Sequence, residues 1–150
     1  MILVGVDPGN VTGVAVWWDP DFYDSSKRGR DVDVAEVEDS TKVSAVIRRM
    51  LNGHRPHLIL VERFKQNARK THQPAASEVT GAVRSLAEEL HVRCVYQSPS
   101  PAKRLGTTAL LKQLDWWTPS RDDHGNSACR HILLGMATFQ PVRFARLTGI

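Results

Sequence analysis

Apolar residues along the first two thirds of the chain predict five strands. Val32, Val34 and Val37 indicate one of them at 32–37, and short apolar runs predict the other four, at residues 2–6, 13–18, 58–61 and 92–96. The first two flank the turn residues 9–12, which favours a hairpin. The run at 58–61 is apolar throughout, as is typical of a strand in a sheet that is covered on both faces.

Other segments show the 3.6-residue apolar period of helices. They are residues 43–51, 75–90, 108–114 and 122–139. Ser40 or Thr41 can cap the first helix and Ser120 the last, whereas Pro99 and Pro101 are expected to break the chain before the third. A hairpin followed by strands that alternate with helices predicts a mixed sheet with helices on its faces, which is an α/β fold.

Length and composition are those of one ordinary globular domain spanning residues 1–150. The chain is 41% hydrophobic and 24% charged. Its two cysteines, Cys94 and Cys129, are far apart and lack a metal-binding spacing, so we expect reduced core residues. The start of the chain lacks a basic segment before its apolar run, and no apolar run approaches the roughly 18 residues of a membrane span. The sequence therefore predicts a cytoplasmic protein with no membrane contact.

The distribution of charge favours nucleic acid as a partner. The formal net charge is +4. Up to Asp39 there are nine acids and three bases, a net charge of −6, so the remaining 111 residues carry +10. A basic surface of this size is typical of nucleic-acid binding, although solvated faces that keep the protein soluble remain the alternative.

Carboxylates stand where the apolar strands end. Asp7 follows the first strand, Glu62 follows the run at 58–61, and Asp122 and Asp123 precede the last helix. Sites in α/β sheets lie at such strand ends. Carboxylates that converge without bases among them favour a divalent cation, and an all-oxygen ligand set suits Mg²⁺ or Mn²⁺ better than zinc. Two such ions about 3.5–4 Å apart can hydrolyse a phosphodiester, so a basic surface beside these acids predicts a nuclease.

The same residues carry a resemblance to a known family. The run VGVDPG at 4–9 with Thr12-Gly13, then Glu62, then an acidic and histidine-containing entry to the last helix, resembles the RuvC family of Holliday junction resolvases. The phrase DHGNSACRH at 123–131 is especially similar to bacteriophage-encoded members, in which a His-x-Asn-Asp-Ala-x-Arg-His pattern recurs. The resemblance covers nearly the whole chain. It implies an RNase H-like mixed five-stranded sheet with helices on both faces.

The resemblance also implies an activity, that of a magnesium-dependent crossover junction endodeoxyribonuclease. Such an enzyme acts as a homodimer on four-way DNA junctions in the bacterial cytoplasm, with Mn²⁺ able to replace Mg²⁺. Asp7 and Glu62 match the first two metal ligands of the family, and His124 matches a third that is Asp or His. Lys103 and Arg104 resemble the family's basic segment near the scissile phosphate, and Lys103 is expected to stabilise developing charge.

Ser127 departs from the family pattern, because an aspartate is expected at that position. A neutral hydroxyl is a poor replacement for a carboxylate ligand. Helical spacing would place Asp123 and His124 on the same face as Ser127, so Asp123, or Asp122, could compensate. Three interpretations stay open: natural variation with a substitute ligand, a substitution that disables the enzyme so that it can be studied intact, or a degenerate junction-binding protein. His131, one turn beyond Ser127, is interpreted as structural.

The segment after Glu62 is the predicted DNA-binding loop. Its candidate contacts are Arg63, Phe64, Lys65, Arg69 and Lys70, joined by Lys103 and Arg104. The basic side chains suit phosphates and Phe64 could stack on an unpaired base, although core packing of Phe64 is an equal alternative.

Two further functions remain as alternatives. One is a broader branched-DNA or fork endonuclease on the same scaffold. The other is nucleotide binding, because Asp-Pro-Gly-x-x-Thr-Gly at 7–13 also resembles the phosphate loop of actin-like kinases and chaperone ATPases. Those proteins need two lobes to enclose a nucleotide, and 150 residues supply one.

Overall fold

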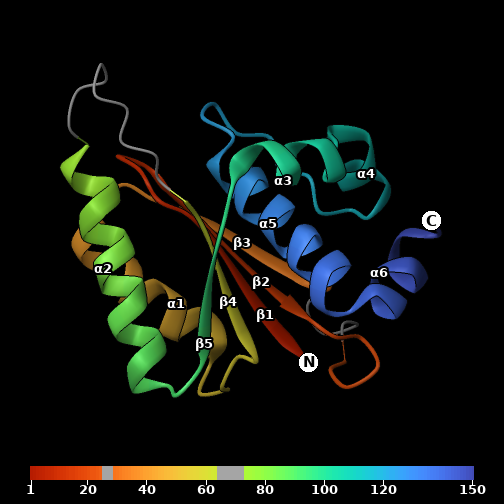
Figure 1. Cartoon of the computed structure of the whole chain (residues 1–150), viewed down its shortest axis with the longest axis horizontal. Helices are drawn as coiled ribbons and strands as arrows, with labels where there is room; N and C mark the ends of the chain where they lie inside the picture. The colour runs from red at the N-terminus through yellow and green to blue at the C-terminus, as the bar shows by residue number, and fades with distance from the viewer. Residues whose placement is uncertain (25–28, 64–72) are drawn as a thin grey trace.

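The computed structural model describes residues 1–24, 29–63 and 73–150, and in this part of the chain five strands form one mixed sheet (Figure 1). The strands are β1 (Ile2–Asp7), β2 (Thr12–Trp18), β3 (Val32–Val37), β4 (Leu58–Glu62) and β5 (Arg93–Gln97). Their order is β3-β2-β1-β4-β5. Strands β1, β2 and β3 pair antiparallel, while β1, β4 and β5 pair parallel. All five predicted strands and the predicted mixed sheet are confirmed.

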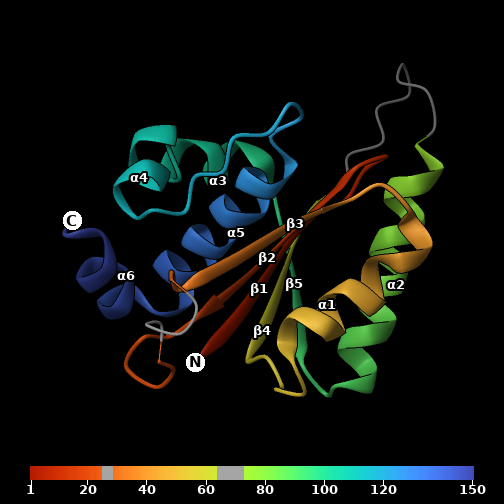
Figure 2. The same cartoon turned by 180° about the vertical axis from the view of Figure 1, so that it is seen from behind.

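Helices cover both faces of the sheet. They are the 3₁₀ turn η2 (Ser40–Lys42), α1 (Val43–Leu51), α2 (Pro74–Glu89), α3 (Pro99–Leu105), α4 (Thr108–Gln113), α5 (His124–Phe139) and α6 (Pro141–Thr148). Helices α1 and α2 lie on one face, and α3 to α6 lie on the other, as the two opposite views show (Figures 1 and 2). Each face has its own hydrophobic core. Residues of both orientations along β1 and β2 are therefore buried, which explains their continuous apolar runs.

Two predictions about where helices begin are wrong, for physical reasons. Asp39, and not Ser40 or Thr41, caps the first helical segment, because its carboxylate accepts from the Thr41 N–H at 3.0 Å. Pro99 and Pro101 do not break the chain. They lie in the first turn of α3, where no backbone donor is missed.

The last long helix begins at His124, and its first turn is capped from another strand. The Gly125 N–H and the Ser120 hydroxyl both donate to Glu36 Oε1 of β3, at 3.0 and 2.6 Å. Ser120 is thus a partner of the capping carboxylate and not the predicted cap. Helix α6, which begins at Pro141, is not predicted by the apolar pattern.

Helix α5 lies directly on β1 and β2 because glycines face it. A Cβ atom added at Gly13 would lie 1.9 Å from the carbonyl oxygen of His124, and one at Gly5 would lie 2.2 Å from that of Ala128. Such distances are far inside van der Waals contact. This close approach holds the first turn of α5 against the strand end that carries Asp7.

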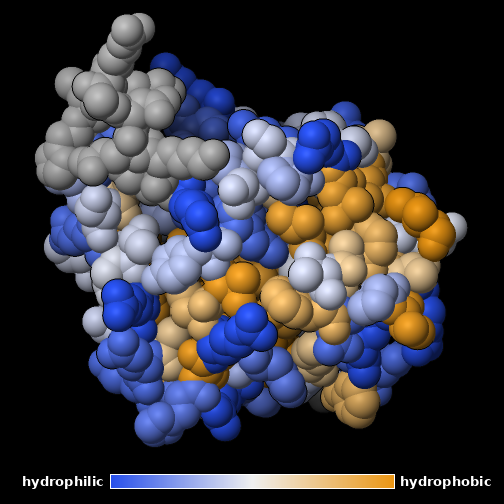
Figure 3. Space-filling view, viewed as in Figure 1, coloured by the Kyte–Doolittle hydropathy of each residue, from blue (hydrophilic) through white to orange (hydrophobic). Residues whose placement is uncertain are grey.

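Hydrophobic side chains are unevenly distributed on the outer surface. In the space-filling view they gather over the region of α4 and α6, while the α2 side is mostly hydrophilic (Figure 3). The large hydrophobic side chains most exposed among the described residues are Phe22, Val142 and Ile150. Within residues 1–24, 29–63 and 73–150, every helix is too short or too polar to cross a lipid bilayer.

Candidate active site

Asp7 and Glu62 lie side by side at one edge of the sheet. Strands β1 and β4 are parallel with Val6 opposite Val61, so the next residue of each strand is one of these two carboxylates. Asp7 is buried and the side chain of Glu62 is 22% exposed. The predicted convergence of the two strand-terminal acids is therefore confirmed.

The start of α5 adds a histidine to this pair. His124 is the first residue of the helix, and its ring Nδ1 lies 2.9 Å from Asp7 Oδ2. The candidate catalytic residues predicted from the sequence line one hollow of about 530 Å³. Among its lining residues are Asp7, Glu62, Lys103, Asp122, Asp123, His124 and Ser127.

The two carboxylates differ in how they are stabilised. Burial, followed by the negative charge of Glu62, raises the pKa of Asp7 above its ordinary value, although the hydrogen bond with His124 works against this. Burial also acts to raise the pKa of Glu62, but the hydrogen bond and electrostatic effect of His131, the hydrogen bond from Ser127 and the charge of Lys103 together outweigh it, and the pKa is lowered. Ionising both adjacent carboxylates therefore costs free energy, and a divalent cation would relieve that cost.

Ser127 stands at the position where the family resemblance leads us to expect an aspartate. Its hydroxyl donates to Glu62 Oε2 at 3.1 Å, and the residue is 7% exposed. Ser127 thus contacts the candidate ligand Glu62 and adds no charge to the site.

Asp123 is engaged by other groups. It lies just before α5 in the left-handed conformation, with φ of 58°. Its Oδ1 accepts from Asn126 at 2.7 Å, and its Oδ2 accepts from the buried Arg130 guanidinium at 2.6 Å. Burial acts to raise the pKa of Asp123, but these two hydrogen bonds and the charges of Arg130 and Lys103 together outweigh burial, and the pKa is lowered. Asp122 lies on the rim of the hollow and is exposed.

These positions limit how a metal could be bound. Among the residues that the structure describes, no three His, Cys, Asp or Glu side chains lie together in a group that could hold one ion. Asp7 and Glu62 supply two hard oxygen donors, which is the chemistry that Mg²⁺ or Mn²⁺ prefers. The pair therefore fits a divalent cation in donor type and charge, with His124 beside Asp7.

The predicted DNA-contact residues fall into three groups. Lys103 of α3 lines the hollow, and its positive charge helps to lower the pKa of Glu62 and Asp123. Its neighbour Arg104 is exposed and is not among the residues that line the hollow. Arg63 is exposed at the end of β4, with its backbone N–H bonded to Gln97. Phe64, Lys65, Arg69 and Lys70 lie outside the described residues.

Sequence reasoning gave no part in the site to two residues next to the acids: His131, which it interpreted as structural, and Arg130. His131 is fully buried, and its Nε2 lies 2.9 Å from Glu62 Oε2. Arg130 spans the hollow's wall, where it bonds Asp123 and the Gly106 carbonyl oxygen. The available signal was the helical spacing, because His131 is four residues after Ser127 and so lies on the same side of α5.

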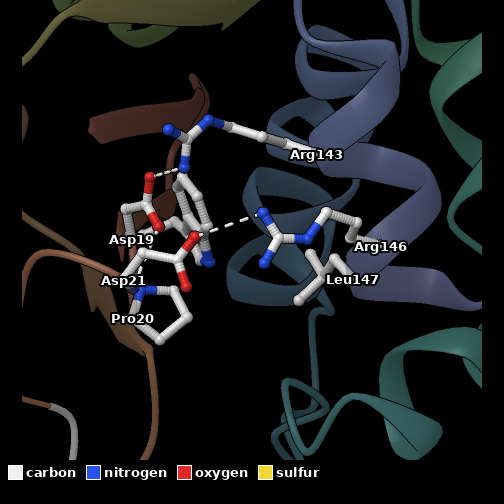
Figure 4. A pocket seen from close by; sticks show the side chains of 7 residues that line it. Asp19, Pro20, Asp21, Arg143, Arg146 and Leu147 are labelled. Atoms are coloured by element: carbon white, nitrogen blue, oxygen red, sulfur yellow. Dashed lines mark hydrogen bonds and ion pairs between the residues drawn. The ribbon is translucent and has the colours of Figure 1, made fainter.

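A second hollow, of about 240 Å³, lies between α6 and the end of β2 (Figure 4). Its two arginines are already paired with its two aspartates: Arg143 with Asp19, and Arg146 with Asp21. The buried Asp19 also accepts from the N-terminal amine. These ion pairs attach α6 to the segment that follows β2. We therefore interpret the hollow as part of a structural contact and not as a binding site.

Comparison with solved structures shows what the fold resembles. Thermus thermophilus RuvC superposes with a TM-score of 0.69 at 18% sequence identity, covering 96% of this chain and 98% of that one. T. thermophilus RuvC in complex with a Holliday junction substrate gives 0.65 at 17% identity, covering 93% and 96%. The fowlpox virus Holliday junction resolvase gives 0.55 at 15% identity, covering 93% and 100%.

No protein-family model and no curated protein sequence matches the chain. The structural matches nevertheless cover nearly all of this chain and of its neighbours. The protein therefore has the RuvC type of RNase H-like fold, as the sequence predicted. The resemblance to bacteriophage-encoded members stays a prediction.

Proposed function

We propose that this protein is a divalent-metal-dependent endonuclease that resolves four-way DNA junctions. The observation that carries the proposal is the pair Asp7 and Glu62, adjacent at the ends of β1 and β4 in a hollow that Lys103 also lines. A carboxylate whose pKa is raised by burial and by a neighbouring acid is typical of functional sites. A fold shared with RuvC and with a viral resolvase supports this choice among nucleases.

Asp7 and Glu62 are the proposed metal ligands. His124 is the proposed third ligand, and it would have to shift from its present contact with Asp7 to reach the same ion. Asp123 and Asp122 are further candidates, and Asp123 would first have to leave Arg130. A Mg²⁺ or Mn²⁺ ion bound there supplies Lewis-acid polarisation of the scissile phosphate. The protein's own contribution is to hold the two carboxylates together, and to place Lys103 where it can neutralise charge that develops on the phosphate.

The DNA partner is proposed from charge and from position. Lys103 lines the hollow, and the exposed Arg63 directly follows Glu62 in the chain. Phe64, Lys65, Arg69, Lys70 and Arg104 are the further proposed contacts. A four-way junction is two-fold symmetric, so paired cuts require two copies of the site, and we propose a homodimer. A less selective branched-DNA or fork endonuclease is the alternative within this class.

A non-catalytic junction binder is the second candidate, and the contacts of Ser127 favour it. The hydroxyl of Ser127 replaces a charged ligand, and Asp123, the obvious substitute, is bonded by Arg130 and Asn126. Such a protein would bind the junction through the same basic surface without cutting it.

The test compares the present chain with Ser127→Asp on synthetic four-way, forked and duplex DNA, with Mg²⁺ and with Mn²⁺. Cleavage of the four-way junction by the present chain supports the resolvase. Cleavage by the aspartate variant alone identifies a disabled resolvase. Binding of the junction without cleavage by either protein would refute the enzyme, and preferential cutting of forks would favour the broader endonuclease.

A further inference from the structure

We propose that His131 and Gln97 are positioning residues that fix the Glu62 carboxylate for cation binding. Gln97 ends β5, His131 lies on α5 and Glu62 ends β4, so the three side chains join three elements behind the hollow. Gln97 and His131 are 8% and 0% exposed, so solvent does not compete for these contacts. The inference rests on the proposed function, because it concerns the same cation site.

The orientation of the Gln97 carboxamide is determined by the backbone of α5. With its nitrogen towards the helix, Gln97 donates to His131 Nδ1 at 2.9 Å and to the His131 carbonyl oxygen at 3.0 Å. Its oxygen then accepts from the Gly135 N–H at 3.2 Å. The opposite orientation would set the carboxamide oxygen against the His131 carbonyl oxygen, with two acceptors facing one another.

This orientation selects one tautomer of His131. Because Gln97 donates to Nδ1, that nitrogen is an acceptor and the ring hydrogen lies on Nε2. The Nε2–H then donates to Glu62 Oε2, 2.9 Å away. The side-chain amide of β5 thus decides that a hydrogen-bond donor, and not a lone pair, faces the carboxylate.

Two donors converge on the same oxygen of Glu62. Oε2 receives the His131 Nε2–H at 2.9 Å and the Ser127 hydroxyl at 3.1 Å. Within the described part of the chain no hydrogen bond reaches Oε1. One oxygen is thereby anchored and the other remains available to a cation in the hollow.

The hydrogen bonds to Glu62 Oε2 hold this carboxylate against repulsion from Asp7. Glu62 stands beside Asp7, and the two negative charges repel one another. Without a donor behind it, the longer Glu62 side chain could rotate away from Asp7 and separate the two oxygen ligands. Hydrogen-bonded partners of metal-ligating groups typically change metal affinity by about 10–100-fold when they are lost.

The matched variants are His131→Gln and His131→Asn. A glutamine carries its amide nitrogen near the place of Nε2 and can still donate to Glu62, whereas an asparagine amide reaches only the place of Nδ1. We expect His131→Asn to weaken Mn²⁺ binding by at least about 10-fold and His131→Gln to keep it within a few-fold. Mn²⁺ binding is measured by the electron paramagnetic resonance of the free ion, without DNA or turnover.

A second measurement uses the unaltered protein and does not depend on folding of a variant. Long-range ¹H–¹⁵N correlation of the histidine rings in metal-free protein is expected to show the His131 hydrogen on Nε2. A hydrogen on Nδ1 would overturn the proposal, as would Mn²⁺ affinity in folded His131→Asn equal to that of the wild type. Equal loss of Mn²⁺ affinity in both folded variants would also overturn it.

The outcomes separate this inference from the proposed function. If the wild type binds Mn²⁺ and cuts junctions while the two variants behave alike, the positioning role fails and the nuclease stands. If the wild type binds no Mn²⁺, both fail together.

Discussion

Replacing Gly13 by alanine tests whether the close approach of α5 to the sheet builds the site. A Cβ at this position would lie 1.9 Å from the carbonyl oxygen of His124 and 2.8 Å from the Gly125 nitrogen. Backbone atoms of a helix cannot rotate away as a flexible side chain can. Since real Cβ contacts are not shorter than 3.0 Å, the first turn of α5 must move by about 1 Å.

This displacement sets the expected magnitude of the effect. Overpacking of a well-packed core costs about 1–3 kcal/mol. In a domain of this size each kcal/mol lowers the melting temperature by roughly 2–4 °C. His124 moves with the turn, away from Asp7, and a misplacement of 1 Å can cost about 100-fold in rate.

Thermal unfolding and junction cleavage measure the two effects. The control is Gly81→Ala in α2, where an added Cβ meets no atom within 4 Å. Alanine is favoured over glycine inside helices by about 0.5–1 kcal/mol, so this variant should melt slightly higher and cut at the wild-type rate. A Gly13→Ala protein with wild-type stability and cleavage would refute the role assigned to this contact.

Three other predictions follow from the charges of the site. Asp7 has a raised pKa in the folded protein, so its ionisation destabilises the fold above that pKa and has no effect below the ordinary Asp pKa of about 3.9. Metal-free Asp7→Asn should therefore melt higher than the wild type at pH 7, with the gain lost as the pH falls through the pKa of Asp7; lower stability at pH 7 would contradict this. Ser127→Asp replaces a donor to Glu62 Oε2 by a third carboxylate beside Asp7 and Glu62, so it should lower the metal-free melting temperature and increase the rise in melting temperature on adding Mn²⁺. An unchanged rise would contradict the placement of Ser127 beside the cation. If five or six basic side chains contact phosphates, a plot of the logarithm of the junction-binding constant against the logarithm of salt concentration should have a slope of about −5. A slope near zero would contradict these phosphate contacts.

The strands and the two strand-terminal acids could be predicted because their signals are local. A buried run that ends on Asp7 or Glu62 is visible in the sequence, and parallel pairing of the two strands brings their ends together. The short last helix could not be found in this way. It follows α5 directly through Pro141 and is fastened by ion pairs with residues more than 120 positions earlier.

The polar contacts behind the acids depend on tertiary structure and were largely hidden. The partner of His131 is set by where β4 and β5 meet α5, which no spacing along the chain reveals. Asp123 was expected to face Ser127 on one side of a helix. It precedes the helix instead, and its carboxylate accepts a hydrogen bond from Arg130. Neither the left-handed backbone at Asp123 nor the buried guanidinium has a local sequence signature.

The most direct test of the central claim separates binding of the junction from cutting. A four-way DNA junction is bound in the presence of a chelator, binding is confirmed, and an excess of Mg²⁺ or Mn²⁺ then starts the reaction. The account predicts that the wild type nicks two opposed strands, and that Asp7→Asn binds the junction equally well and leaves it intact. Equal cutting by the two proteins, or a junction that the wild type leaves intact with either cation, would contradict the claim that Asp7 and Glu62 form a nuclease centre.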